Sequence, residues 1–237
     1  ALDTLSAPPH FGPGGSRLGV AITGAVLGAA QRLAEKLIAV AAVLFQTTPE
    51  HVELMNGMIR VKGMPEARMP FQEVAQTMLA RSDLLPPGID PLPHATYVWT
   101  APGRTMADEQ GRAKSYLTAA NACHLVLVEV DVETAQVHIL KYWIADDCGT
   151  RLNPANVEGQ TQGGVAQGVG AALLEEAVYD EDGQLRTSTF MDYLLPSAHE
   201  APTVEVTLID RARAANPLGV KGAGEIGTLA AGAVVAS

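Results

Sequence analysis

The segment 124–146 most constrains what this chain can fold into. It reads HLVLVEVDVETAQVHILKYWIAD, in which strand-like stretches near 124–131 and 136–146 flank the polar sequence DVETAQ. Two such stretches with a short polar connection predict a β-hairpin. A second hairpin is expected around the pair Asn56-Gly57, which is typical of a two-residue turn, and a further strand over 203–210.

Helical patterns separate these strands. Apolar residues at spacings of three and four predict a long helix from Ser16 to about Gln46. The stretch PFQEVAQTMLARS predicts a short amphipathic helix. A Gly/Gln-rich helix is expected to follow the turn DDCGTRLNP and to end near Tyr179, and a last helix to begin near Glu225.

Proline-rich and glycine-rich segments complete the pattern, with an extended approach over 1–15 and a loop over 83–95. The mixture predicts an α+β fold with mixed sheets and packed helices, without strict βαβ alternation. We expect residues 1–237 to form one region, with a possible division into subdomains at about 1–120 and 121–237. The chain has no initial Met and stops within a helical pattern, so a fragment or a processed subunit is expected.

The composition excludes several classes of partner and site. A net charge of −10 disfavours nucleic acid and anionic membranes, and the longest apolar run, Leu37–Phe45, is too short for a membrane span. The six histidines show no ligand spacing, so no metal site made by the chain's own side chains is predicted. Two isolated cysteines predict no iron–sulfur centre of its own, and they fit a reducing, cytoplasmic compartment.

One carboxylate stands out in NPLGVKGAGEIGT, where Glu225 lies among glycines at the start of the last expected helix. The glycines would let the backbone approach a ligand closely, and a carboxylate beside a bound substrate suits a general base. The alternative is a helix-capping glutamate. Position in a first turn alone favours that alternative, because acids are common there.

Two further glycine-rich segments carry polar side chains. In VEGQTQGGVAQGVG, Gln160 and Gln167 fall on one helix face and could bracket a flat heterocycle, or the glycines could serve only close helix packing. In GPGGSRLG, residues Gly15, Ser16 and Arg17 could bind a phosphate group, or Ser16 could be an ordinary N-cap. Cys148 and His124 are expected to be structural. Together the three glycine-rich loops suit a large, flat, phosphorylated cofactor.

The stretch from DCGTRLNPANVEGQTQGG to FMDYLLPSA, followed by NPLGVKGAGEIGT, closely resembles the molybdopterin-binding large subunit of the xanthine oxidase family. Aerobic carbon monoxide dehydrogenase-like enzymes and bacterial aldehyde or N-heterocycle hydroxylases are the most similar branches. The resemblance implies a molybdenum hydroxylase that uses water as its oxygen source. The chain corresponds to the C-terminal half of such a subunit.

The resemblance also implies roles for individual residues. Glu225 would be the base that takes a proton from the hydroxyl group on molybdenum, and Gln160 would hydrogen-bond the pterin. The remaining implied cofactor-binding residues are Gly15, Ser16, Arg17, Gly222 and Gly224. The first three would hold the phosphate or the nucleotide extension, which in bacteria is usually cytosine dinucleotide.

The partners follow from the same resemblance. Electrons would leave through two [2Fe–2S] clusters and FAD on other subunits, and an N-terminal molybdopterin-binding chain or half would complete the site. The substrate would be an aldehyde, an N-heterocycle or CO. Two alternatives stay open, namely a non-catalytic assembly subunit and a plain ligand-binding module in which Glu225 is a cap.

Overall fold

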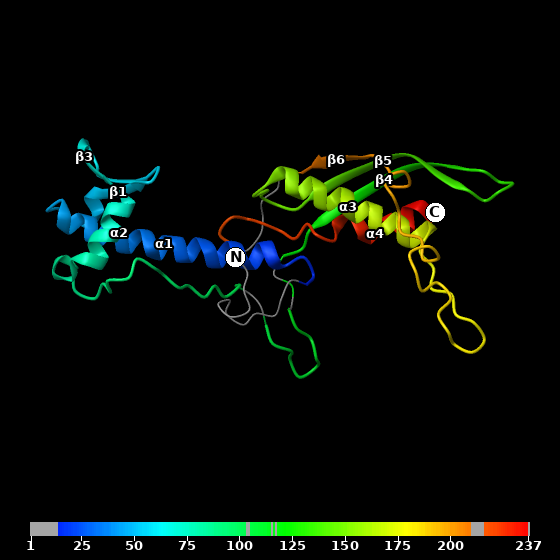
Figure 1. Cartoon of the computed structure of the whole chain (residues 1–237), viewed down its shortest axis with the longest axis horizontal. Helices are drawn as coiled ribbons and strands as arrows, with labels where there is room; N and C mark the ends of the chain where they lie inside the picture. The colour runs from blue at the N-terminus through cyan, green and yellow to red at the C-terminus, as the bar shows by residue number, and fades with distance from the viewer. Residues whose placement is uncertain (1–13, 103–104, 115, 117, 210–215, 237) are drawn as a thin grey trace. The chain divides into compact units, whose positions relative to one another are not determined.

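The computed structural model describes residues 14–102, 105–114, 116, 118–209 and 216–236. The chain divides into two compact units, one formed by Gly24–Thr100 and the other by Ala1–Thr23 together with Ala101–Ser237 (Figure 1). This division differs from the expected boundary near residue 120. The reason is that residues at the start of the first helix contact the C-terminal segment, as in the hydrogen bond between Ser16 and Glu225.

The smaller unit contains most of helix α1 (Leu18–Leu44), an antiparallel sheet and a second helix. The sheet order is β1 (Val52–Met55), β2 (Met58–Val61) and β3 (Met64–Pro70), and α2 spans Phe71–Ala80. Short 3₁₀ turns cover Pro49–His51 and Ser82–Leu84.

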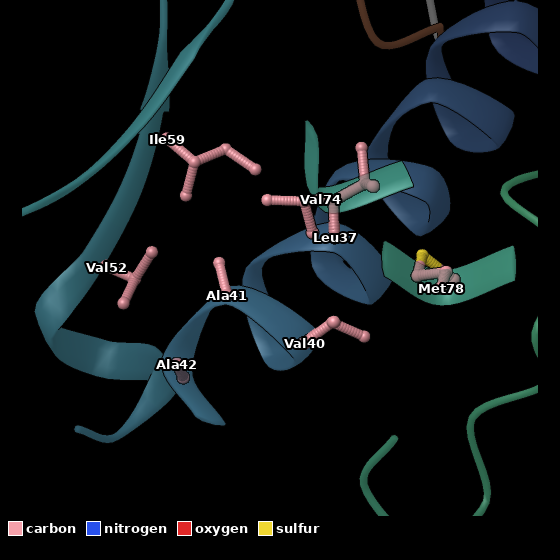
Figure 2. Packing of buried hydrophobic residues seen from close by; sticks show 8 residues of the cluster. All are labelled: Leu37, Val40, Ala41, Ala42, Val52, Ile59, Val74 and Met78. Atoms are coloured by element: carbon pink, nitrogen blue, oxygen red, sulfur yellow. The ribbon is translucent and has the colours of Figure 1, made fainter. Parts of the chain in front are cut away.

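The hairpin predicted around Asn56-Gly57 is present between β1 and β2. Both turn residues have positive φ angles, 53° and 76°, which is the backbone that a tight hairpin turn requires. β3 was not predicted, because MPEARMP has two prolines and no regular apolar alternation. The core of this unit is formed by the residues shown in Figure 2, namely Leu37, Val40, Ala41, Ala42, Val52, Ile59, Val74 and Met78.

Two glycines of α1 allow an aromatic segment to lie against the helix. A Cβ atom on Gly24 would lie 2.3 Å from the ring of Trp99, and one on Gly28 would lie 2.2 Å from the ring of Tyr97. Arg32 donates to the carbonyl of Thr96 at 2.9 Å and stacks over the Tyr97 ring. The segment after the proline-rich loop is therefore held along α1 by shape and by hydrogen bonding.

The larger unit has a three-stranded mixed sheet with both helices on one side (Figure 1). β4 (Asn121–Val130) pairs antiparallel with β5 (Val137–Asp147), as predicted. β6 (Val204–Leu208) pairs parallel to β5. α3 (Pro154–Leu173) connects β5 to β6, and α4 (Ile226–Ala236) packs beside it. The core consists of Tyr142, Ile144, Val165, Val169, Val204, Ala231 and Val235.

α3 begins where predicted but ends at Leu173, before Tyr179. Asn153 caps its start by accepting a hydrogen bond from the backbone N–H of Asn156 at 3.1 Å. At its end, the carbonyl of Gly170 accepts bonds from the N–H groups of both Leu174 and Glu175, each at 2.9 Å, and the chain leaves the helix there.

Small residues bring α3 and α4 into close contact. A Cβ atom on Gly227 would lie 2.1 Å from the carbonyl oxygen of Thr161, and one on Gly168 would lie 2.5 Å from Cβ of Ala231. Glycine at these positions lets the two helix backbones approach closely. The contact therefore fixes the start of α4 against the N-terminal half of α3.

The predicted α+β class is confirmed. The parallel β5–α3–β6 crossover was not expected from the sequence. Among the described residues, no helix is both long enough and apolar enough to span a membrane.

Candidate functional site

A cavity of about 560 Å³ lies in the larger unit where helices α1 and α4 begin. One part of its lining comes from Gly14, Gly15, Ser16, Arg17 and Val20 at the start of α1. The other parts come from Tyr116, Thr118, Ala119 and Ala120, and from Gly222, Glu225, Ile226 and Leu229. Because both helices start at this cavity, their partially positive ends favour an anionic group in it.

Glu225 lines this cavity. The hydroxyl of Ser16 donates a hydrogen bond to Oε2 of Glu225 at 3.1 Å, across 209 residues of sequence. In the described part of α4, no backbone N–H donates to this carboxylate. Instead, the backbone carbonyl of Glu225 accepts the bonds that begin the helix, from Thr228 and Leu229. The side chain is therefore turned to Ser16 and the cavity, and it does not cap its own helix.

Two glycines make room for this contact. A Cβ atom on Gly222 would lie 2.7 Å from Cβ of Ser16 and 2.8 Å from its carbonyl oxygen, so a larger residue would displace the serine. Gly15 and Ser16 both have left-handed backbone angles, with φ of 59° and 53°, which form the turn into α1. The sequence GGSR thus supplies a tight turn that presents Ser16 to Glu225.

Gln160 approaches the same loop from α3. A Cβ atom on Gly224 would lie 3.6 Å from Oε1 of Gln160 and 3.4 Å from the hydroxyl oxygen of Ser16. The structure therefore brings Gln160 near the residues at the cavity. Gln167 lies two helical turns farther along α3, where its Oε1 accepts a bond from Thr228 at 3.4 Å. The structure thus brings seven of the predicted site residues together around one loop, namely Gly15, Ser16, Arg17, Gln160, Gly222, Gly224 and Glu225.

An ion pair that the sequence did not reveal ties this loop to β5. Nζ of Lys221 lies 2.7 Å from Oδ2 of Asp147, and their side chains are only 9% and 16% exposed. The backbone N–H of Lys221 also donates to the carbonyl of Cys148 at 2.8 Å. Asn216 closes the preceding turn through both its amide nitrogen and its amide oxygen, each bonded to the backbone of Val220.

The neighbouring aspartate ties α3 to the same strand. Asp146 is fully buried, and its Oδ2 accepts a bond from the hydroxyl of Thr161 at 3.2 Å. Its Oδ1 has no hydrogen-bond partner among the described residues. Burial raises the pKa of Asp146, while the bond from Thr161 acts in the opposite direction. Thr161 follows Gln160, so this buried bond holds the helix turn that presents the amide.

The residues expected to be structural are buried or half-buried. Nδ1 of His124 lies 2.8 Å from the hydroxyl of Tyr142. Burial lowers the pKa of His124 and raises the pKa of Tyr142 to about 12, so both side chains are neutral near pH 7. Burial also raises the pKa of the Cys148 thiol, which favours the unreactive protonated form.

Comparison with known proteins identifies the family. The pattern of the molybdopterin cofactor-binding domain matches residues 1–202. The chain belongs to this molybdopterin-binding family. The resemblance to molybdenum hydroxylase large subunits of the xanthine oxidase type is confirmed by relatives and by solved structures.

Two curated relatives show how much of a large subunit this molybdopterin-binding chain represents. It is 35% identical to the nicotine 6-hydroxylase large subunit of Paenarthrobacter nicotinovorans, over 93% of this chain and 26% of that one. It is 31% identical to the carbon monoxide dehydrogenase large chain of Afipia carboxidovorans, over 94% of this chain and 26% of that one. The chain therefore spans about a quarter of the length of these relatives, which is less than the half of a large subunit expected from the sequence.

A solved structure shows that the fold is also similar to that of the family. Quinoline 2-oxidoreductase from Pseudomonas putida 86 matches with a TM-score of 0.81 and 33% identity. The match covers 98% of this chain and 28% of that one.

Proposed function

We propose that this chain supplies the catalytic base and part of the cofactor cradle of a molybdenum hydroxylase. The base is Glu225. The observation that carries the proposal is its carboxylate at the cavity, held by Ser16 and close to the loop that Gln160 approaches. This arrangement gathers in one place residues that lie far apart in the sequence.

The residues at the cavity fit a flat, phosphorylated cofactor. The backbone N–H groups at the start of α1, including that of Ser16, and the guanidinium of Arg17 would hold its phosphate groups. The Gln160 amide offers both donors and an acceptor to a pterin ring. The close approach of Gly222 and Gly224 to Ser16 leaves no side chain between the loop and the turn. When bound, the molybdenum cofactor would supply two-electron oxidation of the substrate with oxygen derived from water.

The hydrogen bond from Ser16 distinguishes the two carboxylate oxygens of Glu225. Oε2 of Glu225 is held by the Ser16 hydroxyl, which keeps the side chain in one orientation. Oε1 would then be the carboxylate oxygen that faces the bound cofactor and substrate and accepts the proton released in the reaction. A base positioned in this way typically contributes about 10²–10⁴-fold to the rate.

The substrate class, the cofactor form and the partners belong to the same proposal. We assign an aldehyde, an N-heterocycle or CO as substrate, and the names of nicotine 6-hydroxylase and quinoline 2-oxidoreductase support including N-heterocycles. The cofactor is proposed to carry cytosine dinucleotide. Two [2Fe–2S] clusters and FAD on partner subunits would take the electrons, and an N-terminal molybdopterin-binding polypeptide would complete the site. The two free cysteines support a cytoplasmic location.

The test is the substitution Glu225→Gln in the complete enzyme. Turnover should fall by about 10²–10⁴-fold because the amide cannot accept the proton. The molybdenum content should stay unchanged, since the phosphate-binding and pterin-binding groups are intact. Glu133→Gln, in the exposed turn between β4 and β5, is the matched control and should retain full activity.

Near-full activity of Glu225→Gln would overturn the catalytic role. If the variant instead loses about 0.5–2 kcal/mol of stability and no molybdenum copurifies with the parent enzyme, Glu225 has only a structural role in a plain binding module. If molybdenum content and turnover are the same in a complex that lacks this chain, the chain has an assembly role only.

A further inference from the structure

The sheet of the larger unit has a second face that α3 and α4 do not cover. In the described part of the chain, both helices pack on the side where Tyr142 and Ile144 are buried. Successive side chains of a strand point to opposite faces, so the neighbours of these residues point away from the helices. We call this second side the outer face. Its apolar members are Cys123, Leu125, Leu127, Trp143 and Ala145, and its polar members are Asn121, Glu129, His138, Lys141, Asp147, Glu205 and Thr207.

The outer face is apolar along its centre. Leu125 pairs with Trp143 across the strands, and Cys123 pairs with Ala145. Leu125 is 64% exposed and Leu127 is 51% exposed. A sheet face that stays in water normally carries polar residues at these alternate positions. A contiguous exposed apolar strip instead indicates a contact surface.

Two charged residues near the centre of this face, Lys141 and Glu205, both contact Trp143. Nε1 of Trp143 donates to Glu205 at 3.1 Å, and the ammonium group of Lys141 lies 5.6 Å from the centre of the Trp143 ring. At the end of β5, Asp147 is paired with Lys221. Lys141 and Glu205 carry opposite charges beside the same ring, so covering the centre of this face would bury no net charge there, which lowers the electrostatic cost of burial.

One end of the outer face is hollow. A cavity of about 380 Å³ is lined by Asn121, Ala122 and Cys123 of β4, by Ala145 and Asp147 of β5, and by Ile209. A hollow next to an apolar strip can receive a large side chain of a partner, which is how well-packed interfaces gain most of their affinity.

The length of the relatives indicates what covers this face. The chain corresponds to only 26–28% of each relative, in which the remainder belongs to the same large subunit. A second copy of this chain is a poor alternative, because two chains of net charge −10 repel each other. We propose that the outer face of β4–β5–β6 docks the polypeptide that corresponds to the remainder of the large subunit. This inference rests on the proposed large-subunit role.

The two cysteines provide the first test, in the complete enzyme. Cys123 lies exposed on the outer face of this chain, and Cys148 is buried in it. Alkylation of the native enzyme, read out by peptide mass spectrometry, should modify Cys123 about ten-fold or more slowly than in the urea-unfolded enzyme. Cys148 should be protected in the same way and serves as the internal reference. Modification of Cys123 in the native enzyme at the unfolded rate would overturn the proposal.

A pair of matched substitutions tests the surface directly. Leu127→Glu puts a charge on the outer face, whereas Val132→Glu puts the same charge on the hairpin turn, where Val132 is 91% exposed. Leu127→Glu should restore fast alkylation of Cys123, and Val132→Glu should not. Equal behaviour of the two variants would contradict docking at this face.

Cross-linking through Lys141 identifies the occupant. Links from Lys141 to the remainder of the large subunit are expected, and links between the Lys141 residues of two copies would overturn the choice of partner.

Failure of the docking proposal can be distinguished from failure of the proposed function. An enzyme without molybdenum but with Cys123 protected would refute the function alone, and an active molybdenum enzyme with reactive Cys123 would refute the docking surface alone.

Discussion

At the scale of single residues, two consecutive aspartates organise the site from opposite faces of one strand. Asp146 points inward and accepts the bond from Thr161, beside Gln160. Asp147 points outward and pairs with Lys221, at the start of the loop that leads to Glu225. The end of β5 therefore positions both the amide and the carboxylate of the proposed active site.

The buried carboxyl of Asp146 gives a prediction about pH. Burial raises its pKa, so the folded state binds this proton more tightly than the unfolded chain does. The free energy of unfolding should then fall as the pH rises from about 4, the pKa in the unfolded chain, through the raised pKa of the folded state. Asp146→Asn removes this loss, and it should stabilise the protein at pH 7 by on the order of 1 kcal/mol.

Urea unfolding at pH 7 and at pH 4 measures this effect, and the advantage of Asp146→Asn should shrink at the lower pH. Asp131→Asn is the control with the opposite sign. The backbone N–H of Glu133 lowers the pKa of Asp131, so that carboxylate stabilises the fold above its unfolded pKa and loses this contribution as the pH falls. If Asp146→Asn has the same effect at both pH values, the charge of Asp146 is not what limits stability.

Individual site residues could be singled out from the sequence when they stood out chemically. Glu225, Ser16 and Gln160 sit in glycine-rich stretches that are unusual for folded elements, and the structure brings them together. Asp147 and Lys221 could not be found in this way. They lie 74 residues apart, and neither has a local pattern that marks it as half of an ion pair.

At the scale of elements, the glycine contact between α3 and α4 decides the geometry of the site. Gly227→Ala should destabilise the protein by about 1–3 kcal/mol, because the new methyl group would overlap the backbone of Thr161 and Val165. Gly232→Ala on the same helix is the matched control. Its methyl group would lie 3.9 Å from the nearest atom, so it should stabilise the helix by about 0.5–1 kcal/mol.

Thermal unfolding of the two variants measures the difference. A shift of the same sign and size for both would show that helix propensity, and not the close contact of the helices, determines the effect.

Elements with a local pattern were predictable, and long-range pairings were not. The hairpins and helices follow from turn residues and from apolar spacing, which act over a few positions. β3 lacks such a pattern, and it forms because it completes the sheet against β2. The parallel pairing of β5 with β6 spans the whole of α3 and the loop after it, and nothing in either strand specifies the other.

At the scale of the whole molecule, the two units have separate cores, so damage to one should stay local. Ile59 is fully buried in the smaller unit, and Ile59→Ala should cost about 2–5 kcal/mol there. Hydrogen exchange should increase in β1, β2 and α2, while α3 and α4 keep their protection. Val165→Ala in the larger unit is the reciprocal control. Equal loss of protection in both units would show that they unfold together.

The division into these units was not predictable from composition. Helix α1 begins in one unit and continues into the other, so neither a linker nor a change in residue usage marks the boundary. Contacts between segments that lie far apart in the sequence determine the compact units.

The opposite orientation of Asp146 and Asp147 limits which length changes a gene for this protein can tolerate. Deletion of a single codon between Tyr142 and Asp146 would rotate the end of β5 by one pleat. It would turn the partner of Lys221 toward α3 and the partner of Thr161 toward Lys221. Two codons could be lost with less disruption than one, so insertions and deletions in homologous genes should avoid odd lengths in this strand.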